Sequence, residues 1–309
     1  MSGRHDDWPE LPYGAWRATR DTLHMYLQAI GKVRLALAPM EPQWAQVPLH
    51  VTARGLNTSP IPHPSGVFEI DVDLLEHVVS VRTVRGSVRR IALEPRSVAD
   101  FYRALMDALA SAGVDVTVSE LPSEVPEPIP FPEDTVHASY DAGWAHRFWR
   151  ALVSAHAVLG EHRARFRGKT SQVQLFWGAL DLSYMRFSGR PAEPPPGADV
   201  ITRYSNDAEH VCAGFWPGDA RFPEAAFFAY ASPRPEGIEA AELEPEPARW
   251  SDELGEFLLP YDAVRVAPDP REALLAFLET TYAAASGLAR WDPALASQPG
   301  AVAVHGSAQ

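Results

Sequence analysis

The chain has 309 residues, with 27 lysine and arginine residues against 40 aspartate and glutamate residues, so its formal net charge is −13. An acidic chain argues against non-specific binding to nucleic acid or to an anionic membrane, because both need a basic protein surface. Apolar residues make up 46% of the chain, which is enough for a folded core. The only cysteine, Cys212, excludes an internal disulfide framework and is typical of a reducing compartment, so we expect a cytoplasmic protein.

The two ends of the chain show no targeting or membrane signal. Residues 1–8 lack an apolar core and a small-residue cleavage site, so they do not form a secretory signal. No apolar run approaches the roughly 18 residues that a membrane span needs. The tail, residues 291–309, is rich in alanine, glycine, serine and proline without periodicity, and we expect it to be disordered.

The first half of the chain, residues 1–119, predicts a helix, several antiparallel strands and a second helix. Helical spacing of apolar residues indicates a helix over 15–30 that ends at Gly31. A capping box at Ser97 opens the second helix, which should end at Gly113. Strands are predicted between and after these helices, at 32–37, 49–54, 68–73, 78–81, 88–93 and 114–118.

The second half, residues 136–290, repeats this order. Asp141 can cap a long helix that ends near Gly168 and Lys169. Asp269 precedes a proline and an acidic third position, which together indicate the start of a last helix. Strands are predicted between these helices at 173–177, 180–187, 210–216 and 226–231.

This repetition predicts an α+β fold of two similar halves, each a helix, antiparallel strands and a helix. The two sheets could join into one continuous sheet. An internal duplication would align Gly31-Lys32 with Gly168-Lys169, the segment 54–60 with 186–191, and the two closing helices. The alternative is that any two α+β halves align this loosely.

Two acidic, proline-containing segments stand apart from this pattern. Residues 120–135 should form an extended, polyproline-like connection, since 120–134 holds five prolines, five acids and no base. It could be a linker or a strap across the surface. The segment 236–256 holds eight acids and one arginine, so the two segments carry −5 and −7 of the total −13. The remaining body is nearly neutral and leaves room for an anion site.

Several longer motifs resemble a known family, the bacterial domain of unknown function 5996. The resemblance runs from Trp8 to about Trp291 and implies no activity, substrate or cofactor that a residue could inherit. The motifs are Trp8–Tyr13, Thr52–Leu56, Ser59–Pro62, Thr135–Asp141, Gly214–Gly218 and Gly255–Tyr261.

Basic and polar residues at the predicted strand ends are the main candidates for a binding site. Lys32 and Lys169, the only two lysines, each follow a glycine and could converge on an anion, although a cation at a helix end needs no ligand. The sequence around Lys169 is not a phosphate-binding P-loop, because Arg163 stands where that motif needs glycine. The loop with Arg54, Asn57, Thr58 and Ser59 could orient a polar ligand, or its side chains could shape their own turn. Arg186, Ser188 and Arg190 form a parallel set.

Histidines and aromatic residues add weaker candidates. His137 and Tyr140 precede a helix start, where His137 could act as an acid or base, or simply take part in a capping turn. His210 and Cys212 would share one face of a strand, as a catalytic pair or as packing. Trp216 could form an aromatic pocket wall.

The sequence gives less support for a metal site or for membership of the large enzyme classes. The carboxylates of Glu69, Asp71 and Asp73 fit a solvated sheet face rather than a metal site, and we expect no metal and no cofactor. Motifs of the large metalloprotease, hydrolase and dinucleotide-binding classes are absent from the sequence.

The sequence therefore predicts a protein that binds a small polar or anionic ligand in the cleft between the halves, without deciding whether it is an enzyme. The alternative is a non-catalytic interaction module that docks a protein through 120–134 or 236–256. The expected ligand-binding residues are Lys32, Arg54, Asn57, Ser59, His137, Tyr140, Lys169, Arg186, His210 and Trp216.

Overall fold

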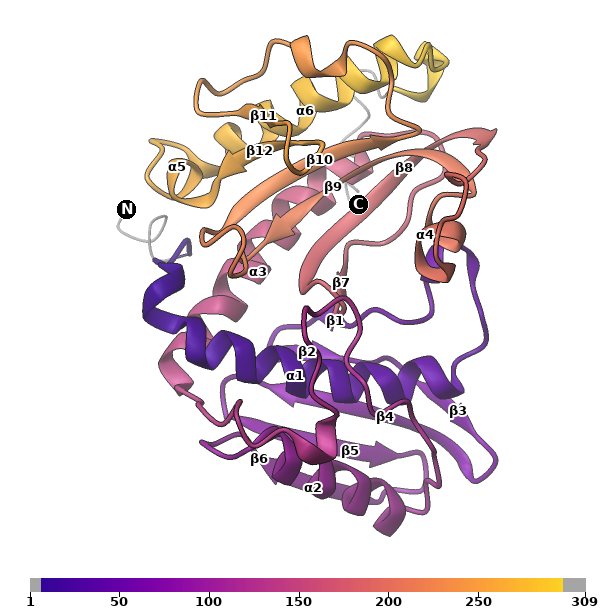
Figure 1. Cartoon of the computed structure of the whole chain (residues 1–309), viewed down its shortest axis with the longest axis vertical. Helices are drawn as coiled ribbons and strands as arrows, with labels where there is room; N and C mark the ends of the chain where they lie inside the picture. The colour runs from indigo at the N-terminus through magenta and orange to yellow at the C-terminus, as the bar shows by residue number, and fades with distance from the viewer. Residues whose placement is uncertain (1–6, 297–309) are drawn as a thin grey trace, which may run out of the picture.

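The structure is a computed structural model that describes residues 7–296, and it contains two antiparallel sheets (Figure 1). Helices α1 and α2 cover one face of the first sheet, and helices α3 and α6 cover one face of the second. The predicted α+β class is thus confirmed, with two helices on each sheet. The sheets do not merge into one continuous sheet; a single bridge between Leu49 and Leu175 joins their edges.

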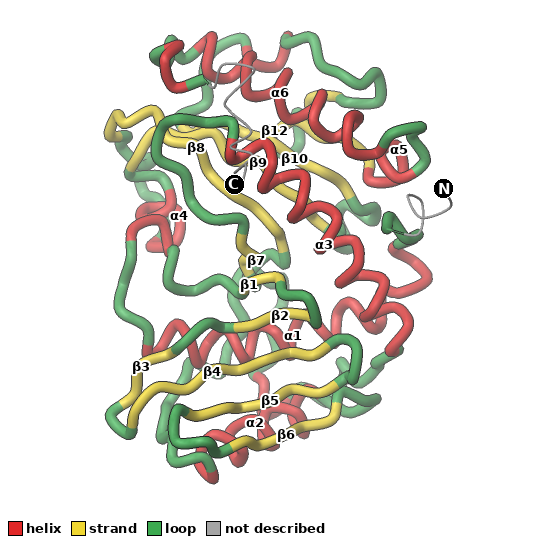
Figure 2. The backbone as a smooth tube through the Cα atoms, turned by 180° about the vertical axis from the view of Figure 1, so that it is seen from behind, coloured by secondary structure: helices red, strands yellow, loops and turns green. Residues whose placement is uncertain are grey.

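The first half forms a sheet in the order β1-β2-β4-β5-β6, with β3 paired to β4 (Figure 2). Its strands are β1 (His50–Val51), β2 (Gly55–Asn57), β3 (Ile61–His63), β4 (Gly66–Asp73), β5 (Val78–Thr83) and β6 (Val88–Ala92). Its helices are α1 (Tyr13–Leu37) and α2 (Val98–Ser111), with short 3-10 turns η1 (Pro42–Trp44) and η2 (Phe131–Glu133).

The second half forms a sheet in the order β11-β12-β10-β9-β8-β7. Its strands are β7 (Gln174–Phe176), β8 (Asp181–Pro191), β9 (Ala208–Trp216), β10 (Ala226–Ser232), β11 (Arg249–Ser251) and β12 (Glu256–Pro260). Its helices are α3 (Ala142–Ala164), α4 (Val200–Ser205), α5 (Tyr261–Arg265) and α6 (Pro270–Leu288), with 3-10 turns η3 (Ile238–Ala240) and η4 (Pro293–Leu295).

The first helix is longer than the sequence suggested. We expected it to end at Gly31 and to be followed by a strand over 32–37, which is wrong, because α1 continues to Leu37. Gly31 lies inside the helix for a packing reason: a Cβ there would stand 2.2 Å from Nε1 of Trp177. The missing side chain lets the indole ring lie directly against the helix backbone.

Two further strand predictions need correction. Residues 114–118 are not part of any sheet, although Val114 and Val118 are buried. Conversely, the sequence analysis missed β11 and β12, which begin within the acidic segment 236–256 or at its end. Few apolar residues alternate there, so the pattern resembled a solvated loop.

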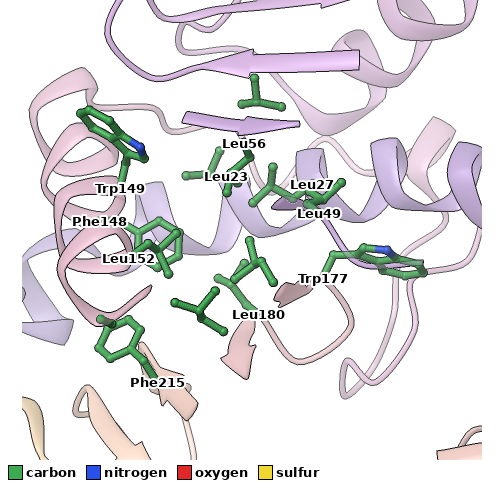
Figure 3. Packing of buried hydrophobic residues seen from close by; sticks show 14 of the residues in the cluster. Leu23, Leu27, Leu49, Leu56, Phe148, Trp149, Leu152, Trp177, Leu180 and Phe215 are labelled. Carbon is green, nitrogen blue, oxygen red and sulfur yellow. The ribbon is translucent and has the colours of Figure 1, made fainter. Parts of the chain in front are cut away.

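One hydrophobic core runs through both halves. Figure 3 shows Leu23 and Leu27 of α1 gathered with Leu152 of α3 and with Leu180, which lies just before β8. The amino-terminal segment adds a second tie, because the Tyr261 hydroxyl donates to the carbonyl oxygen of Pro9 at 2.9 Å. The halves therefore share a core, and no stretch of solvent-separated linker divides them.

The segment 120–134 is a strap packed on the first half. Phe131, near the end of this segment, is fully buried, and its backbone N–H donates to the carbonyl oxygen of Glu120 at the segment's start. The Tyr102 ring of α2 lies 5.6 Å from the Phe131 ring. Of the two alternatives left open by the sequence, the packing corresponds to the strap.

The order of the elements is consistent with the proposed duplication, but the residues that were expected to correspond do not. Both halves share a strand meander between helices, and the second adds β12 and β11 beyond β10. The lysine anchors do not correspond, since Lys32 is buried in α1 whereas Lys169 is exposed in a loop. Arg54 is exposed and Arg186 is buried, so that pair fails too. The duplication stays a prediction from the order of the elements.

The start of the tail is ordered, contrary to expectation. Trp291 is buried, and the carbonyl oxygen of Leu295 accepts a hydrogen bond from the Arg167 backbone at 3.0 Å. An isolated bridge joins Phe166 to Ala296. The remainder of the predicted disordered tail, 297–309, lies outside the described residues.

Candidate functional site

A cavity of about 340 Å³ lies between the two halves, on the face of the second sheet that its helices leave uncovered. Its floor comes from β7, β8, β9 and β10, and its rim from α1, η1, α4 and the strap. The aromatic walls are Trp44, Phe176, Trp177 and Tyr230, and the polar groups include Glu124, Asp181, Ser183 and Cys212.

Strand alternation explains why polar groups reach this face. On β8, Asp181, Ser183 and Met185 line the cavity, while Leu182 and Tyr184 point to the opposite face and into the helix-covered core. Met185 pairs with Cys212 on β9, which pairs in turn with Tyr230 on β10. The three strands thus place their cavity-facing side chains in one row.

One hydrogen bond links two polar groups of this row. The Ser183 hydroxyl donates to Oδ2 of Asp181 at 2.7 Å. Cys212 lies between Met185 and Tyr230 in the register of the three strands. Burial raises the pKa of Cys212 well above its usual value, so the group is a thiol and not a thiolate nucleophile.

Asp181, which lines the cavity, and Glu256, which lies outside its lining, are unusually weak acids. Desolvation, with the nearby charge of Glu124, raises the pKa of Asp181 to about 7, although the bond from Ser183 opposes that shift. Glu256 precedes Phe257, the residue of β12 that pairs with Ala229 beside Tyr230. Burial and the charge of Asp181 raise the pKa of Glu256 to about 7 as well. Both groups therefore titrate near neutral pH.

The strap delivers a third carboxyl. Glu124 is an exposed residue, but its Oε2 lies so close to Gly178 that a Cβ there would come within 1.8 Å of it. Desolvation and the charge of Asp199 raise the pKa of Glu124, whereas Lys32 lowers it. The glycine in the β7–β8 turn thus makes room for this carboxylate.

Buried polar residues on α1 fix the strap and the turn. Lys32 donates to Oγ of Ser123 at 2.7 Å, with its ammonium 5.6 Å from the Trp177 ring centre. Gln28 donates to the Ser123 carbonyl at 2.8 Å and to the Gly178 carbonyl at 3.1 Å. Lys32 acts here as a positioning residue behind the cavity wall.

His24 completes this support one turn earlier. Its Nε2 donates to the carbonyl oxygens of Trp177 at 2.8 Å and Gly178 at 3.0 Å. Burial lowers the pKa of His24 to about 4, so the ring is neutral at neutral pH. The β7–β8 turn is therefore held without a charged partner.

The lining of this cavity carries acids without bases. Among the residues that line it in the described chain there is no lysine, arginine or histidine, whereas Glu124 and Asp181 both face it. Within residues 7–296, no three histidine, cysteine, aspartate or glutamate side chains converge as a set of metal ligands. The arrangement can accept hydrogen bonds and positive charge from an organic group.

A second cavity of about 490 Å³ adjoins the first and has the opposite character. Lys169 and Ser59, two of the predicted residues, line it together with His50, Arg34 and several amides and hydroxyls. Arg34 donates to the carbonyl oxygens of Gln46 at 2.5 Å and Pro48 at 2.7 Å, and to that of Thr58.

The predicted loop residues Arg54 and Asn57 lie elsewhere, on the uncovered face of the first sheet. Arg54 pairs with Asp73 at 2.6 Å, and the Asn57 amide donates to Asp71 at 2.5 Å. Asn57 also accepts a hydrogen bond from the Ser59 backbone, so this loop uses its polar side chains to shape its own turn.

The structure also separates the predicted histidines from the cleft. His137 bonds to the buried Asp134 at 2.7 Å in a tight turn, at a different cavity that Arg17 and Arg20 line. His210 shares its strand face with Cys212, but its Nδ1 donates to its neighbour's carbonyl, that of Ala208, at 2.9 Å.

The last three predicted residues serve packing. Tyr140 hydrogen-bonds to His77 at 2.8 Å. Arg186 lies on the helix-covered side of its sheet, over the rings of Phe166 and Tyr282, where it donates to the backbone of His162. Trp216 stacks on Phe222, 5.7 Å away. None of the three lines either cavity between the halves.

The carboxyl groups at and beside the cavity were not among the predicted site residues. Asp181 belongs to no motif, and Glu256 lies in the family motif Gly255–Tyr261 without an assigned role; each begins a strand beside a glycine-containing turn. Glu124 lies in the acidic, proline-containing segment that the sequence predicts as a linker or a strap. The only available signal was an acid at the edge of an otherwise apolar strand, which most often marks a solvated end.

A family model described as "Family of unknown function (DUF5996)" matches residues 8–298, which confirms the resemblance that the motifs indicated. No curated protein and no solved structure matches the chain. Within the described residues, no helix is long and apolar enough to cross a membrane.

Proposed function

Since the chain belongs to the DUF5996 family, whose function is unknown, we propose its function from the cleft itself: it binds a small organic cation between its two halves. One observation carries this proposal. The cavity presents the carboxyl groups of Glu124 and Asp181 between aromatic walls, without a basic residue in its lining.

The physical basis is the cost of ionising desolvated carboxyl groups. Desolvation raises the pKa of Asp181 and that of Glu256 to about 7. The charge of Glu124 adds to the shift of Asp181, and the charge of Asp181 adds to that of Glu256. A bound cation would offset both effects and favour the ionised form. The rings of Trp177 and Tyr230 would add cation–π attraction to the same group.

Protonated amines fit this lining better than anions do. An ammonium group can donate three hydrogen bonds, and the cavity offers carboxylate acceptors on two sides. A carboxylate or phosphate placed there would face like charge. The location thus agrees with the predicted cleft, whereas the sign of the ligand's charge differs from the anion that the sequence suggested.

The test uses a matched pair of probes, 2-phenylethylamine and the neutral 2-phenylethanol, in thermal-shift titrations. We expect the amine to stabilise the protein and the alcohol to have a much smaller effect. Asp181→Asn keeps the shape of the side chain and should reduce the amine's effect. Equal shifts from amine and alcohol, or equal amine shifts in wild type and variant, would contradict the proposal.

The interaction-module alternative has less support from the packing. Both acidic segments are anchored to the body, with Phe131 of the first and Ile238 of the second fully buried. Deletion of 236–256 would also remove β11 from the sheet edge. A loss of partners in such a variant would therefore have to be separated from a loss of folding.

A further inference from the structure

The two cavities between the halves share three wall residues. Gln43, Phe176 and Met185 line the carboxyl-bearing cavity and also the larger cavity beside it. Gln43 belongs to η1 of the first half, and the other two belong to β7 and β8 of the second. A ligand long enough to pass these residues would occupy both cavities.

The second cavity carries positive charge. Lys169 and Arg34 line it, and Glu41 is the only acid among its lining residues in the described chain. His50, which also lines this cavity, is affected by the same positive charge. Burial and the charge of Arg34 lower the pKa of its imidazole to about 4. The charge of this cavity is thus opposite to that of its neighbour.

Lys169 is the basic residue of this cavity that is best placed to bind an anionic group. Its ammonium lies 5.5 Å from the Phe187 ring centre, and across the described chain it has no carboxylate partner. Arg34 is different, since its guanidinium is buried and already bonded to backbone carbonyls. The hydroxyl of Ser59 and the amide of Gln172 line the same space and supply further donors.

We propose that the larger cavity is a subsite for an anionic group of the same ligand, held by Lys169, so that the ligand is a zwitterion with its charges at opposite ends. This inference rests on the proposed function and specifies the class of molecule. The amine end would lie by Asp181, the anionic end by Lys169, and the apolar middle against Phe176 and Met185.

The pairing of charges would give specificity as well as affinity. A simple amine would leave Lys169 unpaired, and a simple carboxylate would leave the carboxyl groups of Glu124 and Asp181 unpaired. Only a molecule with both charges, separated by an apolar spacer, satisfies the two ends together.

The test compares three probes by isothermal titration calorimetry: 2-phenylethylamine, 4-(2-aminoethyl)benzoate and its uncharged methyl ester. The benzoate carries a carboxylate on the side of the ring opposite the amine. We expect the benzoate to bind the wild-type protein about tenfold more tightly than the other two amines, the worth of one charge-assisted hydrogen bond.

Lys169→Met removes the charge while keeping the length of the side chain. It should remove the preference for the benzoate and leave the affinity for 2-phenylethylamine unchanged. Arg85→Gln is the control, because Arg85 is exposed in the β5–β6 turn and has no ion pair in the described chain. It should keep the preference.

The two proposals fail in different ways. If 2-phenylethylamine binds but the benzoate binds no better, or if Lys169→Met keeps the preference, the anionic subsite is overturned and the cation site stands. If none of the amines binds, the proposed function itself fails. If Arg85→Gln also removes the preference, the effect belongs to the overall charge of the protein, and the subsite is again overturned.

Discussion

The carboxylates on the uncovered faces of the two sheets differ in whether a basic side chain pairs with them. These two faces point to opposite sides of the molecule (Figures 1 and 2). On the first sheet, Asp73 is paired with Arg54 at 2.6 Å and Asp71 with Arg82 at 2.7 Å, with both arginines about half exposed. On the second sheet, Asp181 faces a cavity without a basic partner.

This difference distinguishes carboxylates that only solvate a sheet surface from a carboxyl group that could bind a ligand. Carboxylates paired with exposed arginines cost little to keep ionised, and such surface pairs contribute only about 0–1 kcal/mol. A desolvated carboxyl without a cation is unfavourable in its ionised form, and a fold gains nothing by keeping it. The second sheet therefore presents a carboxyl group that has no basic partner in the lining of its cavity, which is why we propose the cleft, and not the first sheet, as the binding site.

The largest expected effect is on stability after Asp181→Asn. The folded pKa of about 7 exceeds the usual 3.8, so the folded state retains a proton that the unfolded state releases, and stability falls as pH rises from about 4 to about 7. The amide removes this loss. We expect the variant to be more stable than wild type at pH 8 by about 1–3 kcal/mol, after allowance for partial exposure.

Urea unfolding at pH 4 and pH 8 measures this effect. At pH 4 the difference between variant and wild type should nearly disappear, because Asp181 is protonated in the folded state there. A variant that is less stable at pH 8 would show that the carboxylate has a favourable partner in the folded protein.

A smaller effect of Asp181→Asn is expected on a neighbouring carboxyl. Removing the Asp181 charge should lower the pKa of Glu256, because that charge contributes to raising it. Carboxyl carbon NMR titration of Glu256 in the variant would show the shift directly. An unchanged Glu256 titration would mean that the two groups are not coupled, and Asp181 would then be a single unusual carboxyl rather than a member of a pair.

Gly178→Ala should affect the site more than the fold. A Cβ would displace Oε2 of Glu124, the free end of a flexible side chain, so we expect a stability change below about 1 kcal/mol. Amine binding should weaken as it does in Glu124→Gln, the matched control. If Gly178→Ala binds amine normally while Glu124→Gln does not, the turn does not position the carboxylate.

The smallest effect belongs to the first sheet. Asp71→Asn removes the same charge as Asp181→Asn, but from an exposed pair, so it should lower stability by less than about 1 kcal/mol. It should not alter amine binding. A stabilising effect at pH 8 as large as that of Asp181→Asn would remove the distinction between the two faces.

Much of the fold could be predicted from local patterns. Strand β4 alternates cleanly between buried and solvated residues, and Ser97, Asp141 and Asp269 cap the helices that the sequence assigned to them. The failures came from distant contacts. The sequence predicted a helix end at Gly31. The structure shows that glycine is needed there to make room for the Trp177 ring, 146 positions later in the chain.

The site was harder to predict than the fold. The sequence placed the expected site between the halves, and Lys169 does line a cavity there. It could not show that Lys32 instead supports the strap through Ser123. In the sequence, Asp181 is an ordinary acid at the start of a strand. Only the folded structure shows that it is desolvated and that no basic residue lines its cavity. Desolvation depends on residues from both halves, so no local motif encodes it.

Calorimetric titration of 2-phenylethylamine at pH 6 and pH 8, into wild type and Asp181→Asn, tests the cation site most directly. The probe stays protonated at both values, so a change in affinity reports on the protein. We expect the wild type to bind more tightly at pH 8, where Asp181 is ionised without a cost in deprotonation, and the variant to bind weakly at both. Affinity that is independent of pH, or equal in the two proteins, would contradict the assignment of Asp181 as the cation partner.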